Sequence, residues 1–293
     1  MGEFTLDIRK LTKFNEKVIK EIREVEGICK NHDGVNGSLF LDTSMNFHQD
    51  IKSIFLLYKD NRLVSLLTMF IPMNEEAEIS AYTLPEYRRK GYFKRLLEEA
   101  IEEVKKYHIP YLMFICEPES NDGLETIKKL NAELDFTEYS LRYNNPSSEM
   151  KIENVPNISL QRAEQNDLDG IISLSQEVFN DDYEVAKSII TKTLEANNRV
   201  QYVAKLEGKP IGIGSVSFEN NEASIFGVGV SPKYQGKGFG RELIMLIINE
   251  LKRKGIENIM IEVDSLNERA FKLYKSCGFQ VEASFHYFRK SVS

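Results

Sequence analysis

Val228-Gly229-Val230-Ser231-Pro232-Lys233-Tyr234-Gln235-Gly236-Lys237-Gly238-Phe239-Gly240-Arg241 joins a β-branched run, which stops at a proline, to an amphipathic helix. Three alternating glycines leave backbone N–H groups uncovered where that helix begins. Unpaired N–H groups and the positive end of the helix dipole together attract an anion. Leucine and isoleucine recur at four-residue spacing from position 243 to 251, as in a helix with one buried face. The stretch therefore predicts a strand, a phosphate-binding loop and a helix.

The spacing of these glycines excludes two common phosphate-binding motifs. The P-loop pattern would need glycine where Ser231 stands, and serine or threonine in place of Gly238. The dinucleotide fingerprint would need its third glycine at Arg241, one residue after Gly240. A phosphate compound bound here would therefore be of a different kind, and the alternative is a glycine-rich strand-to-helix turn that binds no ligand.

The pattern Gln235-x-x-Gly238-x-Gly240, preceded by Val228-x-Val230, resembles the acyl-coenzyme-A loop of the GNAT family, the Gcn5-related N-acetyltransferases. The resemblance implies acetyl-coenzyme A as cosubstrate, with the pantetheine arm pairing with backbone groups of Val228 and Val230. The residues that it assigns to coenzyme binding are Val228, Gly229, Val230, Gln235, Gly236, Lys237, Gly238, Phe239, Gly240, Arg241 and Asn267.

A later segment, residues 261–279, resembles another motif of the same family: a strand, an asparagine at the next helix start, and Gly-Phe after that helix. Asn267 is a favourable N-cap residue, and Ala270 and Tyr274 fall on one helix face. The resemblance implies that Tyr274 returns a proton to the thiolate of coenzyme A. A packing role beneath the sheet is the alternative for this tyrosine.

The family fold is a mixed, mostly antiparallel sheet flanked by helices, whose two middle strands run parallel and splay apart. In this chain those strands correspond to residues 222–230 and 258–264. Gly227 and Gly229 suit a bulged strand that a ligand backbone approaches closely.

The chain repeats this pattern. Pro85-x-Tyr87-x-x-Lys90-Gly91 matches Pro232-x-Tyr234-x-x-Lys237-Gly238 at a separation of 147 residues (238 minus 91). The repeat predicts an α/β protein with two tandem copies of the GNAT fold. We expect an N-terminal domain over 1–145, a polar linker over 146–156 and a C-terminal domain over 157–293.

Composition limits the class of protein. A chain of 293 residues with 42% hydrophobic content can form two cores, and a net charge of -7 disfavours nucleic acid as a partner. No apolar run approaches a membrane span and the start lacks signal-peptide features, so we expect a cytoplasmic protein with no membrane contact. The three cysteines are predicted to be core residues, and the four histidines show no metal-ligand spacing.

Transfer to an amine needs a proton acceptor. A primary amine of pKa near 10 is neutral in only about one part in a thousand at pH 7, which costs roughly 4 kcal/mol. Many relatives use a carboxylate on the strand before the glycine loop. Here Ser224 occupies the usual position and Glu222 lies two residues earlier on the same strand face. Glu222 is the candidate base, Ser224 acting through water and the absence of any base being the alternatives.

The first half departs from the family pattern. Phe93 stands where glycine or alanine is expected, and its ring would crowd a phosphate. Aligning Phe136 on Phe279 places Asn131 opposite Tyr274 and Leu124 opposite Asn267, so the acid and the cap are missing. We expect one productive site per chain, in the second half. The basic run Arg88-Arg89-Lys90-Gly91 leaves a second coenzyme site open.

The resemblance implies an N-acetyltransferase that acts on a primary amine of a small molecule or peptide by direct attack in a ternary complex. The alternative is a non-catalytic acyl-coenzyme-A-binding sensor or scaffold. Asp181 to Glu184 suits either an acceptor pocket for a cationic amine or a helix capping box. The sequence leaves open the acceptor, the acyl group and the choice between monomer and homodimer.

Overall fold

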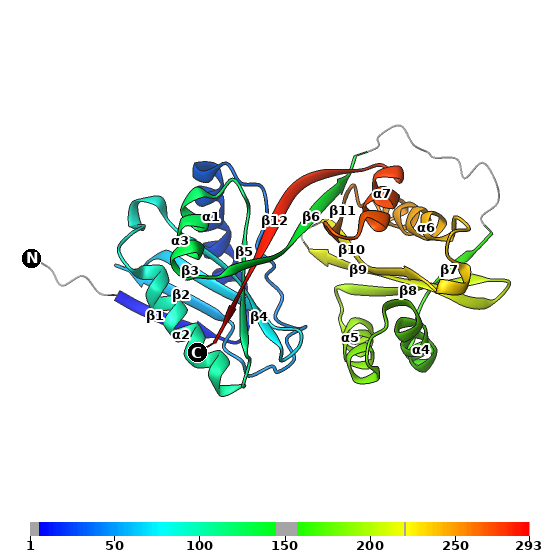
Figure 1. Cartoon of the computed structure of the whole chain (residues 1–293), viewed down its shortest axis with the longest axis horizontal. Coiled ribbons are helices and arrows are strands. Elements are labelled where there is room, and N and C mark those ends of the chain that lie inside the picture. The colour runs from blue at the N-terminus through cyan, green and yellow to red at the C-terminus, as the bar shows by residue number, and fades with distance from the viewer. Residues whose placement is uncertain (1–5, 145–156, 220, 293) are drawn as a thin grey trace, which may run out of the picture. The chain divides into compact units, whose positions relative to one another are not determined.

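The computed structural model describes residues 6–144, 157–219 and 221–292 (Figure 1). Its contacts divide the chain into two units, one made of Met1–Glu138 with Ala283–Ser293 and the other of Tyr139–Glu282. Each unit contains strands and helices in the order that the repeat predicts, so the prediction of two similar mixed α/β units in one chain is confirmed.

The first unit is built on a sheet of strand order β1-β2-β3-β4-β5-β12-β6. Its strands are β1 (Leu6–Leu11), β2 (Ile54–Lys59), β3 (Arg62–Phe70), β4 (Glu76–Thr83), β5 (Tyr111–Cys116) and parts of β12 (Phe279–Ser291) and β6 (Glu133–Tyr143). Its helices are α1 (Glu16–Asp33), α2 (Tyr92–Lys106) and α3 (Asn121–Lys129). Strands β2 and β3 form a hairpin, and Asp60 and Asn61 form its turn with φ of 51° and 64°.

The second unit has the strand order β12-β6-β11-β10-β9-β8-β7. Its further strands are β7 (Ser159–Arg162), β8 (Arg199–Leu206), β9 (Lys209–Glu219), β10 (Glu222–Val230) and β11 (Asn258–Asp264). Its helices are α4 (Leu168–Phe179), α5 (Tyr183–Glu195), α6 (Phe239–Arg253) and α7 (Glu268–Ser276). Helices α4 and α5 cover one face of this sheet, and α6 and α7 cover the other (Figure 1).

Strands β6 and β12 each contribute residues to both units. In the first unit β12 lies between β5 and β6, and in the second unit β6 lies between β12 and β11. Residues 286–291 of β12 pair with β5 in antiparallel register. The linear division predicted from the sequence gave all of 157–293 to the second domain, whereas the contacts assign Ala283–Ser293 to the first unit. Hydrophobic alternation identifies a strand but not its neighbour, which explains the difference.

The two middle strands of each unit separate as predicted. Strands β10 and β11 are parallel and pair only from Glu222 to Ile225, opposite 258–261. Strands β4 and β5 pair only over 76–79 and 111–114. The predicted bulge in β10 is confirmed, because its register with β9 shifts between Phe226 and Gly229 and Gly227 has φ of 57°. The register of β4 with β3 is unbroken.

Each unit has an apolar core between its sheet and helices. The three cysteines are free and buried, as predicted. Burial raises the pKa of Cys29 and of Cys116 to about 11, so both thiols stay protonated and unreactive near neutral pH. Within the described parts of the chain, no helix combines the length and apolar character needed to cross a bilayer.

Candidate functional site

The glycine loop of the second unit joins β10 to α6. Gly236 and Gly238 have φ of 75° and 88°, a conformation that strains residues with a Cβ. The backbone N–H groups of Arg241 and Glu242 bond to the Gly238 carbonyl at 3.0 and 3.1 Å. In the described part of the chain, the N–H groups of residues 236–240 have no acceptor. These unpaired donors at a helix start have the chemistry of an anion cradle.

Gln235 fixes the loop to its surroundings. Its amide nitrogen donates to the Val230 carbonyl at 2.9 Å, and its amide oxygen accepts from Arg269 at 2.8 Å. Arg269 lies in the first turn of α7 and adds positive charge beside the loop. Sequence reasoning missed Arg269, because its distance from the glycines along the chain hides its proximity in space.

The bulged part of β10 is contacted by α4. A Cβ added to Gly229 would lie 2.1 Å from Val178 and 3.2 Å from the ring of Phe179. The close approach that the sequence predicted for a ligand backbone at Gly229 is therefore made here by the end of α4. Val230 is buried, and Val228 packs at the edge of the same core.

Asn267 and Tyr274 lie on α7. Asn267 is the N-cap, as predicted, and its side chain accepts from the Ala270 N–H at 3.1 Å. Tyr274 is buried and packs near Phe279, with ring centroids 6.3 Å apart. Burial, with a smaller effect of Cys277, raises the pKa of Tyr274 to about 12. The phenol therefore keeps its proton throughout the neutral range.

Glu222 lies at the amino end of β10, where β10 and β11 are still paired. Its carboxylate binds Arg142 at 3.0 Å, and Arg142 also binds Glu282 at 2.7 Å. At about 3.3 Å per residue, Glu222 is roughly 25 Å along the strand from Val230, where the loop begins. The structure thus does not bring Glu222 to the glycine loop, and its role as base stays a prediction. Ser224 is two residues closer to the loop.

A capping box of Asp181 and Glu184 was one of the two interpretations of the start of α5. The helix begins at Tyr183 with Asp182 as N-cap, and no side-chain cap bond forms there. The capping box expected for Asp181 and Glu184 is therefore wrong, because the helix starts one residue later than that pattern requires.

The first unit contains a cavity of about 490 Å³ between the separating ends of β4 and β5. The loop after β4, the start of α3 and the segment after α1 complete its wall. Arg88 corresponds to Gln235 and donates to the Thr83 carbonyl at 3.0 Å, as Gln235 does to Val230. Gly91 has φ of 78° and caps α2 as Gly238 caps α6.

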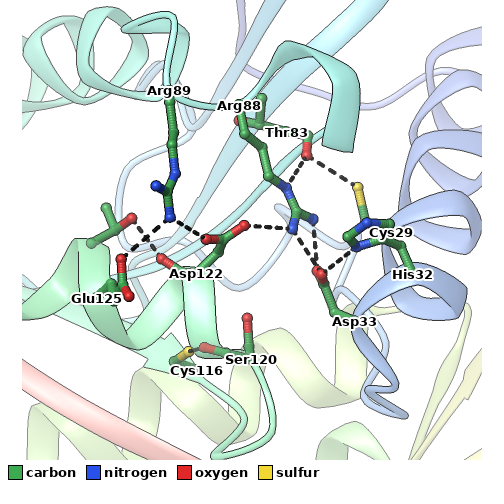
Figure 2. A network of polar contacts seen from close by, with 11 residues as sticks. Cys29, His32, Asp33, Thr83, Arg88, Arg89, Cys116, Ser120, Asp122 and Glu125 are labelled. Carbon is green, nitrogen blue, oxygen red and sulfur yellow. Dashed lines mark hydrogen bonds and ion pairs between the residues drawn. The ribbon is translucent and has the colours of Figure 1, made fainter.

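Acidic side chains surround the loop of this first unit. Figure 2 shows Arg88 between Asp33, at 2.7 Å, and Asp122, at 3.1 Å. Arg89 binds Asp122 at 3.2 Å and Glu125 at 3.5 Å. The two arginines that the sequence suggested as phosphate ligands are therefore paired with carboxylates of the protein.

The separation of 147 residues holds through α3 and α7, which cover 121–129 and 268–276. Ile127 thus corresponds to Tyr274, and Ser120 to Asn267. The alignment predicted from the sequence, with Asn131 opposite Tyr274 and Leu124 opposite Asn267, is wrong because it matched two phenylalanines that are not in register. The side chain of Ser120 makes no cap bond.

Among the residues that the structure describes, no group of three or more His, Cys, Asp or Glu side chains is arranged to hold a metal ion.

Comparison with known proteins agrees with this geometry. The family model described as acetyltransferase (GNAT) family matches residues 20–126 and again 168–279. The ribosomal protein bS18-alanine N-acetyltransferase of Escherichia coli (strain K12) is 33% identical over 91 residues, which are 30% of this chain and 62% of that protein. Mycothiol acetyltransferase of Renibacterium salmoninarum is 44% identical over 55 residues, 19% of this chain and 16% of that protein. The chain thus spans less than two thirds of either relative.

Two solved structures share the whole architecture. A tandem GNAT protein from the clavulanic acid biosynthesis pathway has a TM-score of 0.75 at 13% identity, with 99% of both chains covered. A GCN5-related N-acetyltransferase from Sphaerobacter thermophilus has a TM-score of 0.72 at 14% identity, covering 98% of this chain and 96% of that one. At such identities the likeness concerns the fold. With the family model matched once in each half, the chain belongs to the GNAT acetyltransferase family and carries its fold twice.

Proposed function

We propose that this protein transfers an acetyl group from acetyl-coenzyme A to a primary amine of a small molecule or peptide, at a site in its second unit. The unpaired N–H groups of residues 236–240 at the start of α6 carry the proposal, because they form an anion cradle beside the open edge of β10. The relatives named above as acetyltransferases support the reaction class.

The residues of the loop fit a coenzyme pyrophosphate. A Cβ at Gly236 or Gly238 would meet nothing within 4 Å, so the backbone there is accessible. Lys237 belongs to the loop and Arg269 donates to Gln235, so both add positive charge there, and Gln235 holds the loop in place. Beyond Ile225 the edge of β10 that faces β11 is unpaired, which leaves room for the pantetheine arm along Val228 and Val230.

The hydroxyl of Tyr274 is proposed to act on the departing thiolate. A phenol of pKa about 12 transfers its proton to a thiolate of pKa about 8.5 only against roughly 5 kcal/mol. Tyr274 therefore stabilises the developing thiolate chiefly by donating a hydrogen bond. This role requires the hydroxyl group, and its contribution to turnover should not change with pH between 6 and 9.

Glu222→Gln tests the proposed base. A general base contributes about 10² to 10⁴ in rate, whereas a half-exposed ion pair contributes about 0 to 1 kcal/mol of stability. Because Glu222 lies in the Arg142 cluster far from the loop, we expect turnover to fall by less than about threefold. Steady-state kinetics at saturating acetyl-coenzyme A measure this. A loss of a hundredfold or more would support Glu222 as the base and require the acceptor to bind near the amino end of β10.

The proposed function is tested by an acceptor screen with mass detection of acetylated products, combined with equilibrium dialysis of acetyl-coenzyme A. We expect one tight coenzyme site per chain and an acetylated amine among small-molecule and peptide acceptors. The alternative of a non-catalytic sensor or scaffold would be supported by a different result. In that case acetyl-coenzyme A would bind tightly, but no amine of a broad library would be acetylated and no thiol would be released slowly. Two equal coenzyme sites would contradict the assignment of the site to the second unit alone.

A further inference from the structure

The first-unit cavity lies in a part of the fold that the proposed transfer reaction does not use. It occupies the separation between β4 and β5 and has a volume of about 490 Å³, within the range of small-molecule sites. Apolar side chains form much of its wall, among them Val35, Leu39, Ile79, Phe114 and Phe285. The wall suits a ligand with an apolar body.

The charges at the loop end of this cavity are inverted relative to the second unit. At a separation of 147 residues, Asp122 corresponds to Arg269 and Glu125 to Lys272. Arg269 supports the proposed coenzyme loop, whereas Asp122 binds both Arg88 and Arg89. The first loop thus holds a carboxylate of its own where the second loop has a cation.

These carboxylates are ionised near neutral pH. Hydrogen bonds from Arg88 and Arg89 lower the pKa of Asp122. Burial acts to raise the pKa of Asp33, but hydrogen bonds from Arg88 and His32 outweigh it and hold that pKa below the usual value. A phosphate that entered here would have to compete with Asp33, Asp122 and Glu125 for Arg88 and Arg89, so the cavity disfavours a phosphorylated ligand.

Glu117 is the exception among the acids of the cavity. It is only 7% exposed, and its two oxygens accept the N–H groups of Asn36 and Gly37 at 2.8 Å each. Within the described ranges it forms no ion pair, although the other lining acids do. The lining lysines are engaged elsewhere, Lys94 with Glu98 at 3.9 Å and Lys129 with Glu125 at 4.0 Å. Among the described residues, Glu117 is a buried carboxylate in the cavity wall that pairs with none of the lining cations, and such a group favours a cationic ligand.

Two neighbours define the site around Glu117. A Cβ at Gly37 would lie 2.9 Å from the Glu117 oxygen and 2.3 Å from the Phe285 ring, so the carboxylate is held firmly by close-packed backbone. Tyr82 lines the same cavity, and among the described residues its hydroxyl has no hydrogen-bond partner. Burial, with smaller effects of Glu26 and Glu117, raises the pKa of Tyr82, so its hydroxyl remains available for hydrogen bonding.

We propose that the first-unit cavity binds a small organic ammonium compound that carries no phosphate, with the cation at Glu117 and the apolar body between β4 and β5. This site is separate from the acetyl-transfer site and does not depend on that function. It gives the first unit a ligand of its own in place of a second coenzyme.

Calorimetry on the full chain without coenzyme tests this site, with 2-phenylethylammonium and n-hexylammonium as probes. The neutral 2-phenylethanol and the anionic 3-phenylpropanoate are matched to the first probe in size. We expect saturable binding of the ammonium compounds at millimolar or lower concentration, with the alcohol at least about tenfold weaker and the carboxylate weaker still. Equal binding of ammonium and alcohol, or no saturable binding of either ammonium probe, would overturn the proposal.

Variants separate this site from any amine site in the second unit. Glu117→Gln removes the charge and should weaken 2-phenylethylammonium at least about tenfold. Asp264→Asn is the matched control, because Asp264 is the equivalent of Glu117 147 residues on and accepts the Leu266 N–H at 2.8 Å. The affinity of the Asp264→Asn variant for 2-phenylethylammonium should equal that of the wild type. If Glu117→Gln keeps both the melting temperature and the affinity of the wild type, or if Asp264→Asn weakens binding equally, Glu117 is not the cation site. If Glu117→Gln fails to fold, the affinities of the wild type for the three phenyl probes still show whether the cavity prefers a cation.

Discussion

Gly238→Glu abolishes binding of acetyl-coenzyme A. The substitution places a carboxylate beside the N–H groups of residues 236–240, where the pyrophosphate is proposed to bind. Two unit charges about 4 Å apart at an effective dielectric constant of about 20 repel by about 4 kcal/mol, about a thousandfold in affinity. Calorimetric titration with acetyl-coenzyme A measures the loss.

Gly91→Glu is the matched control. Gly91 and Gly238 cap corresponding helices, have φ of 78° and 88°, and a Cβ added at either position would meet nothing within 4 Å. The strain of a side chain at positive φ, about 1 to 2 kcal/mol, should therefore lower the melting temperature similarly in both variants. Only Gly238→Glu should lose the coenzyme. Retained affinity in a folded Gly238→Glu chain, or equal loss in Gly91→Glu, would contradict the assignment to the second unit.

The local features of the loop could be predicted from the sequence because they depend on neighbours along the chain. Gly227, Gly236 and Gly238 all adopt positive φ, and the bulge lies where the glycines of β10 indicated it. The 147-residue separation, read from one proline-tyrosine motif, extends from the hairpins to α7. Glycine and proline constrain backbone dihedrals directly, so their pattern carries this information.

Contacts between distant segments could not be predicted in the same way. The neighbours of β6 and β12 in the sheet could not be predicted, because hydrophobic alternation indicates a strand without identifying the strands that pair with it. The side chains that decide the charge of the two loops, Arg269 and Asp122, come from helices about thirty residues downstream. The sequence indicated that the first loop was altered at Phe93, but not that its arginines are paired internally.

Tyr274→Phe lowers turnover by roughly 10² and leaves the affinity for acetyl-coenzyme A within a few fold of the wild type. The ring is retained, so the packing against Phe279 and the core is preserved, and only the hydroxyl that donates to the thiolate is lost. Single-turnover kinetics with the best acceptor measure the effect on the chemical step. Tyr202→Phe is the control, since Tyr202 is another buried tyrosine of the same core.

The pH dependence distinguishes a hydrogen-bond donor from a titrating group. Because burial raises the pKa of Tyr274 to about 12, the phenol is protonated at every pH from 6 to 9, and deprotonation begins to remove the donor only as the pH nears 12. The ratio of wild-type to Tyr274→Phe turnover should therefore be constant across pH 6 to 9. A ratio that falls toward one as the pH rises would mean that the hydroxyl ionises in this range, against the burial seen here. A ratio of one throughout would show that Tyr274 serves packing alone.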